Sequence, residues 1–141
     1  MLLAIDTATD RASLALDDGA EILTERNWLC ANNHTVELAP QVEHMLRTAG
    51  VRAEALEALA VALGPGSFTG LRIGLAFAKG LALAHMLPLL GVPTLDIVAY
   101  AQPKRDGILL AVLSAGRGRI AAGAYRLSEA GWRADGPARI T

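Results

Sequence analysis

Short apolar runs separated by polar turns open the chain. Residues 2–5 form a wholly apolar run of strand length, and apolar residues dominate again over 12–16. The turn signal Asp-Asp-Gly follows at 17–19, and 22–29 is typical of a third strand. The pattern therefore predicts an antiparallel meander of three strands.

A helical spacing replaces the strand pattern in the next segment. Asn33 or Thr35 is a candidate N-cap for a helix that runs to about Thr48 and is stopped by Gly50. Pro40 is expected to kink this helix unless it lies in the first turn.

A strand, a tight turn and a helix come next. Residues 59–63 are an apolar run of strand length, and a glycine-rich turn over 64–70 leads into a helix that ends at about Met86. Ser67 or Thr69 is suited to cap that helix, because a hydroxyl oxygen accepts a hydrogen bond from a free N–H group of the first turn.

A short strand at 89–93 and a helix capped by Thr94, ending before Pro103, complete the first set of elements. The composition then turns polar, and two fresh strands are predicted at 108–113 and 120–127.

These elements divide the chain into two regions. Residues 1–102 are expected to form an N-terminal lobe, and 103–141 the beginning of a second, incomplete lobe. The tail from 131 onward contains Gly and Pro with little periodicity, and no strand is assigned to it.

Composition adds a surplus of apolar residues. Of the 141 residues, 52% are hydrophobic and 19% are charged, and a small monomer does not readily bury so much apolar surface. A sheet covered on both faces and an apolar patch kept for a partner both explain the surplus. The apolar helices favour the partner.

The same counts exclude several classes of protein. The N-terminus begins a strand rather than a signal peptide, and no apolar stretch is long enough to span a bilayer, so a cytoplasmic protein without a membrane segment is expected. Cys30 is the only cysteine, which excludes an internal disulfide and a thiolate metal cluster. The net charge of −1 argues against a protein that binds nucleic acid unaided.

Charge is distributed unevenly along the chain. Residues 1–100 contain six Lys or Arg against eleven Asp or Glu (net −5), and 101–141 contain seven against three (net +4). The basic segment either faces an anionic partner or carries scattered solvated arginines, and the second interpretation is favoured.

The most informative segment is 64–74, Gly-Pro-Gly-Ser-Phe-Thr-Gly-Leu-Arg-Ile-Gly. Its glycines make a sharp turn, with Gly66 the candidate for a positive φ, and the free N–H groups at the helix start are able to bind an anion. Known phosphate loops fit badly, since the dinucleotide pattern needs a glycine where Thr69 stands and no Gly-Lys-Ser/Thr follows. A structural turn that brings strand and helix into close contact is therefore favoured over a phosphate cradle.

This segment and the residues after it, to Ala82, closely resemble the hallmark segment of the TsaB (YeaZ) family of tRNA threonylcarbamoyladenosine biosynthesis. Residues 4–9, His34-Thr35 and 90–95 resemble the same family in order and spacing, so the resemblance covers residues 1 to about 100. It implies an α/β fold of the actin-like ATPase type (ASKHA, ribonuclease H-like). That fold has a mixed sheet flanked by helices, here with the start of a second, similar lobe.

The resemblance also implies a function: a non-catalytic subunit that dimerises with and supports a TsaD-type transferase, which forms N6-threonylcarbamoyladenosine in tRNA next to the anticodon. A TsaE-type ATPase is the further partner implied, and tRNA is contacted only indirectly. No cofactor is expected, and a magnesium nucleotide is possible only through the complex. The TsaD-type relative has a His-x-x-x-His metal pair that aligns with Thr94 and Val98 here, and His34, His44 and His85 are too dispersed to replace it, so neither a metal site nor a catalytic residue is expected.

An active actin-like ATPase or small-molecule kinase is the alternative. In proteins of that fold an aspartate at the end of the first strand faces the metal of the nucleotide, and Asp6 stands at this position. The candidates for a nucleotide or anion site are Asp6, Thr7, Gly66 and Ser67.

Two helices, at about 34–48 and 70–86, carry apolar residues on more than one face and are expected to form the partner surface. The spacing of Gly70 and Gly74 permits a close backbone approach along one edge. The predicted contact residues are Val36, Leu38, Val42, Met45, Gly70, Leu71, Gly74, Leu75 and Ala78. A homodimer is expected when the chain is alone, exchanging for the heterodimer when the relative is supplied.

Overall fold

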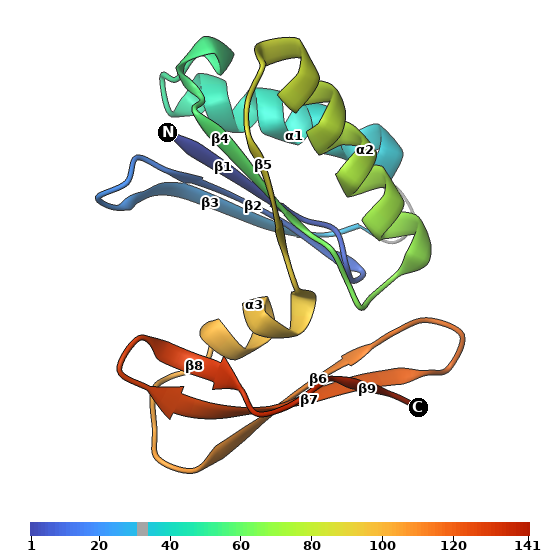
Figure 1. Ribbon diagram of the computed structural model, residues 1–141. Helices are drawn as coiled ribbons and strands as arrows, with labels where there is room; N and C mark the ends of the chain where they lie inside the picture. Colours follow the sequence, from blue (N-terminus) through green and yellow to red (C-terminus); the bar gives the residue numbers. More distant parts are fainter. Residues whose placement is uncertain (31–33) are drawn as a thin grey trace.

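The computed structural model describes residues 1–30 and 34–141, and Figure 1 shows them arranged around two sheets. The first sheet contains β1 (Leu2–Asp6), β2 (Arg11–Asp17), β3 (Ile22–Leu29), β4 (Ala58–Ala62) and β5 (Leu89–Val92). Its strand order is β3-β2-β1-β4-β5, and it is mixed, because β1 pairs antiparallel with β2 and parallel with β4. The predicted meander and mixed sheet are confirmed.

One face of the first sheet is covered by helices. The elements there are α1 (His34–Thr48), a single 3-10 turn η1 (Ala53–Ala55) and α2 (Phe68–His85). Alternate strand residues such as Leu3, Ile5, Leu14 and Leu16 are buried in one cluster with the inward side chains of α1 and α2. None of the described helices has the length and apolarity needed to cross a bilayer.

The ends of α1 differ in part from the prediction. The helix begins at His34, so Thr35 lies inside its first turn rather than at its cap, while Asn33 lies outside the described residues. Pro40 is inside the helix and beyond its first turn. Gly50, the predicted stop, follows the last helical residue by two positions and has a φ of 68°, a conformation that glycine adopts without a Cβ clash.

The second sheet is antiparallel. It contains β6 (Ile108–Ser114), β7 (Ile120–Ser128), β8 (Gly131–Ala134) and β9 (Arg139–Ile140), with β7 pairing all three others. The strands predicted at 108–113 and 120–127 are confirmed, but β8 and β9 lie in the tail where no strand was assigned. Short strands of this kind are held by pairing with β7 and by the burial of Trp132, so local periodicity does not reveal them.

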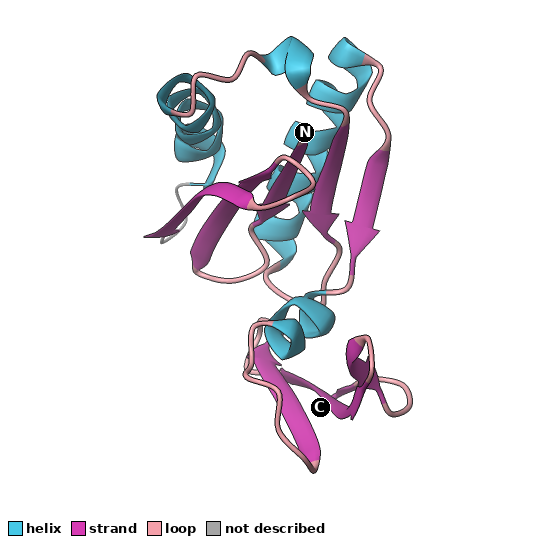
Figure 2. Ribbon diagram, turned by 90° about the vertical axis from the view of Figure 1, so that its left-hand side faces the viewer, coloured by secondary structure: helices cyan, strands magenta, loops and turns pink. Residues whose placement is uncertain are grey.

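A third helix, α3 (Thr94–Tyr100), follows β5 of the first sheet but packs on the second (Figure 2). Its buried residues Leu95 and Ala99 form a cluster with Ala111, Tyr125 and Trp132 of the second sheet. The boundary between residues 102 and 103 stays a prediction. Helix α3, just before this boundary, lies between the two sheets, and its apolar side packs on the second sheet.

Candidate functional site

The turn between β4 and α2 is built on Ser67. Its Oγ accepts a hydrogen bond from the N–H of Gly70 at 3.2 Å, so Ser67, one of the two predicted caps, is the N-cap of α2. The N–H of Ser67 donates to the carbonyl oxygen of Ala8 at 2.6 Å. The turn is therefore held against the loop after β1, as the structural interpretation of this segment requires.

Three glycines of the turn and helix allow this close contact. A Cβ atom added at Gly66 would overlap the carbonyl of Ala8, and one added at Gly70 or Gly74 would overlap Thr7. The Thr7 hydroxyl donates a hydrogen bond to the carbonyl oxygen of Gly70 at 2.7 Å. The glycines are thus needed where α2 passes over the end of β1.

Gly64, rather than Gly66, has the positive φ, at 102°. Its N–H donates to Thr94 Oγ1 at 3.0 Å, and its carbonyl oxygen accepts from the N–H of Thr94 at 2.9 Å. The predicted capping role of Thr94 is wrong, because Pro93 is the N-cap residue of α3 and the Thr94 hydroxyl bonds to Gly64 instead. Thr94 thereby joins the glycine-rich turn to the start of α3.

The residues that align with the metal pair of the TsaD-type relative have internal roles here. Thr94 is buried and bonded to Gly64, and Val98 packs against the core of the second sheet. Within residues 1–30 and 34–141, no three His, Cys, Asp or Glu side chains are grouped to hold a metal ion. That the chain has neither a metal nor a catalytic residue of its own stays a prediction.

Three of the four candidates for a nucleotide or anion site take part in the turn just described. Thr7 is buried and bonds to Gly70, and Ser67 caps α2. Gly66 provides the space for close packing on Ala8. Asp6 lines a cavity on the open face of the first sheet and Ser67 lines a separate one at the start of α2, so the structure does not bring the four candidates together around one cavity, and the nucleotide or anion site stays a prediction.

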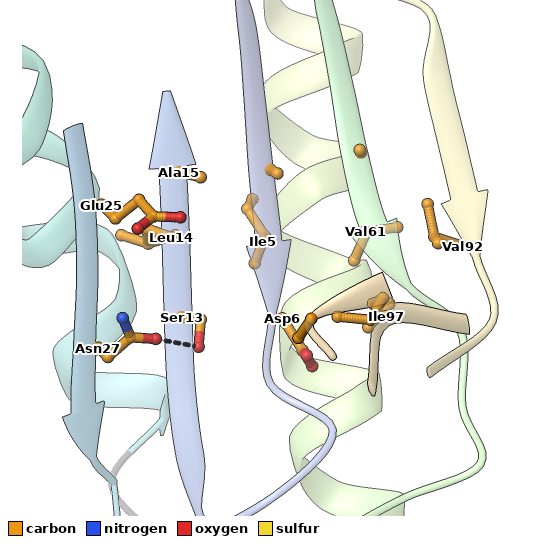
Figure 3. A pocket seen from close by; sticks show the side chains of 14 residues that line it. Ile5, Asp6, Ser13, Leu14, Ala15, Glu25, Asn27, Val61, Val92 and Ile97 are labelled. Carbon is orange, nitrogen blue, oxygen red and sulfur yellow. Dashed lines mark hydrogen bonds between the residues drawn. The ribbon is translucent and has the colours of Figure 1, made fainter. Parts of the chain in front are cut away.

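A cleft of about 370 Å³ lies between the open face of the first sheet and α3, and is called the sheet–α3 cleft below (Figure 3). Asp6, Ser13 and Asn27 are register neighbours across β1, β2 and β3, and the Ser13 hydroxyl donates to Asn27 Oδ1 at 2.7 Å. Ile97 and Ala101 line the cleft from the side of α3. The cleft therefore has one polar and one apolar side.

Burial raises the pKa of the Asp6 carboxyl above its ordinary value of 3.8. A hydrogen bond from the N–H of Ala8 to Asp6 Oδ1, at 2.9 Å, favours the charged form and lowers the pKa by less than burial raises it. The carboxylate is therefore less well stabilised in the cleft than it is in water.

The structure divides the predicted partner residues into groups. Six of them lie in the interior: Leu38, Val42, Met45, Gly70, Gly74 and Ala78. Leu71 and Leu75 are half-buried, and Val36 is exposed. These six are packed within the chain itself: Gly70 and Gly74 lie against Thr7, and Leu38, Val42, Met45 and Ala78 belong to the core cluster of the first sheet.

The outward face of α2 and its C-cap residue Met86 carry a different set, called the α2 stripe: Phe68, Arg72, Ala76, Lys79, Leu83 and Met86, all exposed and spaced by three or four residues. The exposed fraction is 72% for Phe68, 83% for Leu83 and 91% for Met86. The Arg72 guanidinium lies 5.1 Å from the centre of the Phe68 ring. Sequence reasoning omitted this set, although the spacing of Arg72 and Lys79 marked the face that meets solvent.

Comparison with known proteins places these features in a family. The family model described as "TsaD: tRNA N6-adenosine threonylcarbamoyltransferase" matches residues 28–139. The chain is 41% identical to the tRNA threonylcarbamoyladenosine biosynthesis protein TsaB of Escherichia coli, over 92% of this chain and 57% of that protein. It is 33% identical to TsaB of Bacillus subtilis, over 89% of this chain and 55% of that protein.

A solved structure gives the same result. YeaZ from Pseudomonas aeruginosa superimposes with a TM-score of 0.90 at 32% identity, over 99% of this chain and 66% of that chain. The predicted α/β fold, with a mixed sheet and helices packed on it, is confirmed and is shared with YeaZ. The chain spans a little over half the length of the curated relatives it matches.

Proposed function

The chain belongs to the TsaB (YeaZ) family, and from this premise we propose that it is a non-catalytic assembly subunit of tRNA threonylcarbamoyladenosine biosynthesis. Its partner in this proposal is a TsaD-type transferase. The observation that carries the proposal is the α2 stripe, an exposed row of apolar and cationic side chains with no catalytic group in it.

The exposed apolar side chains of the stripe favour association. Burying a large apolar side chain contributes about 1.5–3 kcal/mol, and three of this kind stand in water along α2. Val36 of the neighbouring α1 is also exposed, at 74%. A surface formed by two adjacent helices is suited to pack against the two equivalent helices of a second molecule.

Two forms of that contact follow from the shared fold. The family model that matches this chain describes the transferase, so the two proteins share a fold. The transferase would therefore have helices equivalent to α1 and α2. Two copies of this chain would then mimic the heterodimer through an isologous contact. A homodimer is expected when the chain is alone, and it exchanges for the heterodimer when the transferase is supplied.

The proposal leaves the chemistry to the partner. The transferase would hold the metal and the reacting groups, while this chain would supply shape and surface. A TsaE-type ATPase as a second partner, contact with tRNA only through the assembly, a cytoplasmic location and the lack of a cofactor of its own belong to the same proposal. They follow from the family rather than from a residue of this chain.

Sedimentation of Leu83→Glu, alone and with the transferase from the same source, tests the proposal. Leu83 is exposed, so the variant should keep the circular dichroism spectrum of the wild type while it loses dimerisation and at least about tenfold in affinity for the transferase. Leu110→Glu, an equally drastic change on the second sheet, is the matched control and should pair normally. A folded Leu83→Glu protein that still forms both dimers would show that the α2 stripe is not the interface.

A further inference from the structure

We propose that the sheet–α3 cleft binds a small organic cation with a flat apolar body, held by Asp6 at one side of the cleft floor. This inference rests on the cleft alone and does not depend on the α2 stripe or on the proposed function.

The strand register builds the floor of the cleft in two rows. One row consists of the paired residues Asn27, Ser13 and Asp6 on β3, β2 and β1, and of the pair Ala62 and Val92 on β4 and β5. The next row, two residues along each strand, contains Glu25, Ala15, Ala4 and Ala60. Residues two apart on a strand point to the same face, so both rows belong to the floor. The first row is polar from β3 to the end of β1 and apolar on β4 and β5, and the second row is alanine apart from Glu25.

The alanines of the floor, Ala4, Ala15 and Ala60, leave its centre free of large side chains. Ile97 covers the floor from α3 on the opposite side (Figure 3). A cavity of about 370 Å³ with one apolar side and a few converging polar groups has the character of a small-molecule site.

The charges that line the cleft select a cation. Among the described residues, the ionisable ones that line the cleft are Asp6 and Glu25, and both are acidic. Asp6 Oδ1 accepts the N–H of Ala8, and among the described residues no donor bonds to Oδ2. Burial also raises the pKa of Asp6, so a cation beside it would relieve an unfavourable charge, whereas a phosphate would add to it.

A charge series on one ring tests the proposal. Benzamidine, benzamide and benzoate share shape and differ in charge, and each is titrated into the full chain while backbone amide chemical shifts are followed by NMR. Benzamidine should give saturable shifts at residues 4–6, 13–15 and 60–62, with affinity at least about tenfold above that of benzamide, and benzoate should not bind. Binding of benzamide or benzoate as tight as that of benzamidine would overturn the proposal, as would no saturable binding of benzamidine.

Three variants place the site. Asp6→Asn keeps the acceptor for the N–H of Ala8 but removes the charge, and should lower the affinity for benzamidine at least about tenfold. Ala60→Leu should block the floor and abolish binding. Glu21→Gln, which removes an exposed carboxylate outside the cleft, should bind like the wild type. If all three folded variants bind benzamidine equally, the cation is held elsewhere and the assignment to this cleft fails.

Discussion

Gly64 and Thr94 exchange two hydrogen bonds across thirty residues of sequence. The N–H of Gly64 donates to Thr94 Oγ1, and the N–H of Thr94 donates to the carbonyl oxygen of Gly64. Thr94 stands where the resemblance to the TsaD-type relative aligns a metal-binding histidine. In this chain the position joins the glycine-rich turn before α2 to the first residue of α3, which is a structural role.

Thr94→Val should destabilise the protein by about 1–3 kcal/mol, because it keeps the shape of the buried side chain but leaves the N–H of Gly64 without its acceptor. Urea unfolding followed by circular dichroism measures the change. Thr94→Ser retains the hydroxyl and should lose clearly less. Equal losses for the two variants would mean that packing of the methyl group, not the hydrogen bond, is what matters at this position.

Gly74→Ala should cost about 1–3 kcal/mol, since its new Cβ would overlap the Thr7 side chain where α2 passes over β1. Gly80→Ala is the matched control in the same helix. No atom lies near its added Cβ, so this variant should gain about 0.5–1 kcal/mol from helix propensity. Thermal or urea unfolding of both variants measures the two changes in stability. A gain in stability for both variants would contradict the close packing at Gly74.

Asp6→Asn should be more stable than the wild type at pH 7. The folded pKa of Asp6 is raised, so its favourable contribution is complete below the ordinary value of 3.8 and is lost as pH rises through the folded pKa. Asparagine is neutral at every pH, and the advantage of the variant should therefore shrink as the pH falls and vanish below 3.8. Unfolding free energies measured over this range test the sign. A wild type that is the more stable protein at pH 7 would show that Asp6 is stabilised as a carboxylate.

Tyr125→Phe should destabilise the second sheet by about 1.5–3 kcal/mol. The Tyr125 hydroxyl donates to Asp96 Oδ1 at 2.6 Å, and a hydrogen bond to a carboxylate contributes more than one between neutral groups. Burial, and then the bond to Asp96, raises the pKa of the phenol, so it stays protonated in the physiological range. Tyr100→Phe changes an exposed tyrosine on the same helix as Asp96 and should leave stability unchanged. Matching effects of the two changes in urea unfolding would rule out the bond as the cause.

The local pattern of residues predicts most of the secondary structure. It fails where contacts with distant segments determine the conformation. The meander, the cap at Ser67 and the stop at Gly50 follow from neighbouring residues. Thr94 has the sequence of a helix cap, but its hydroxyl is engaged by a residue thirty positions earlier. β8 and β9 form because they pair with β7. Strands this short have no periodicity of their own from which the pairing could be predicted.

The residues of the partner surface were also not predictable from local sequence alone. A row of small residues at intervals of four permits close approach to a partner helix or to the chain's own sheet, and its sequence does not choose between them. The choice is made by Thr7, which lies under Gly70 and Gly74 once β1 is in place. Arg72 and Lys79 lie on the outward face, as expected because long cationic side chains are seldom buried.

All strands of the first sheet precede Pro93 and all strands of the second follow Thr94, so the polypeptide passes from one sheet to the other only once among the described residues. Helix α3 is the element that follows the first sheet, packs on the second and forms one wall of the cleft. The two hydrogen bonds between Gly64 and Thr94 hold the first residue of α3 to the segment that follows β4. The floor and the opposite wall of the cleft are therefore tied together at this junction.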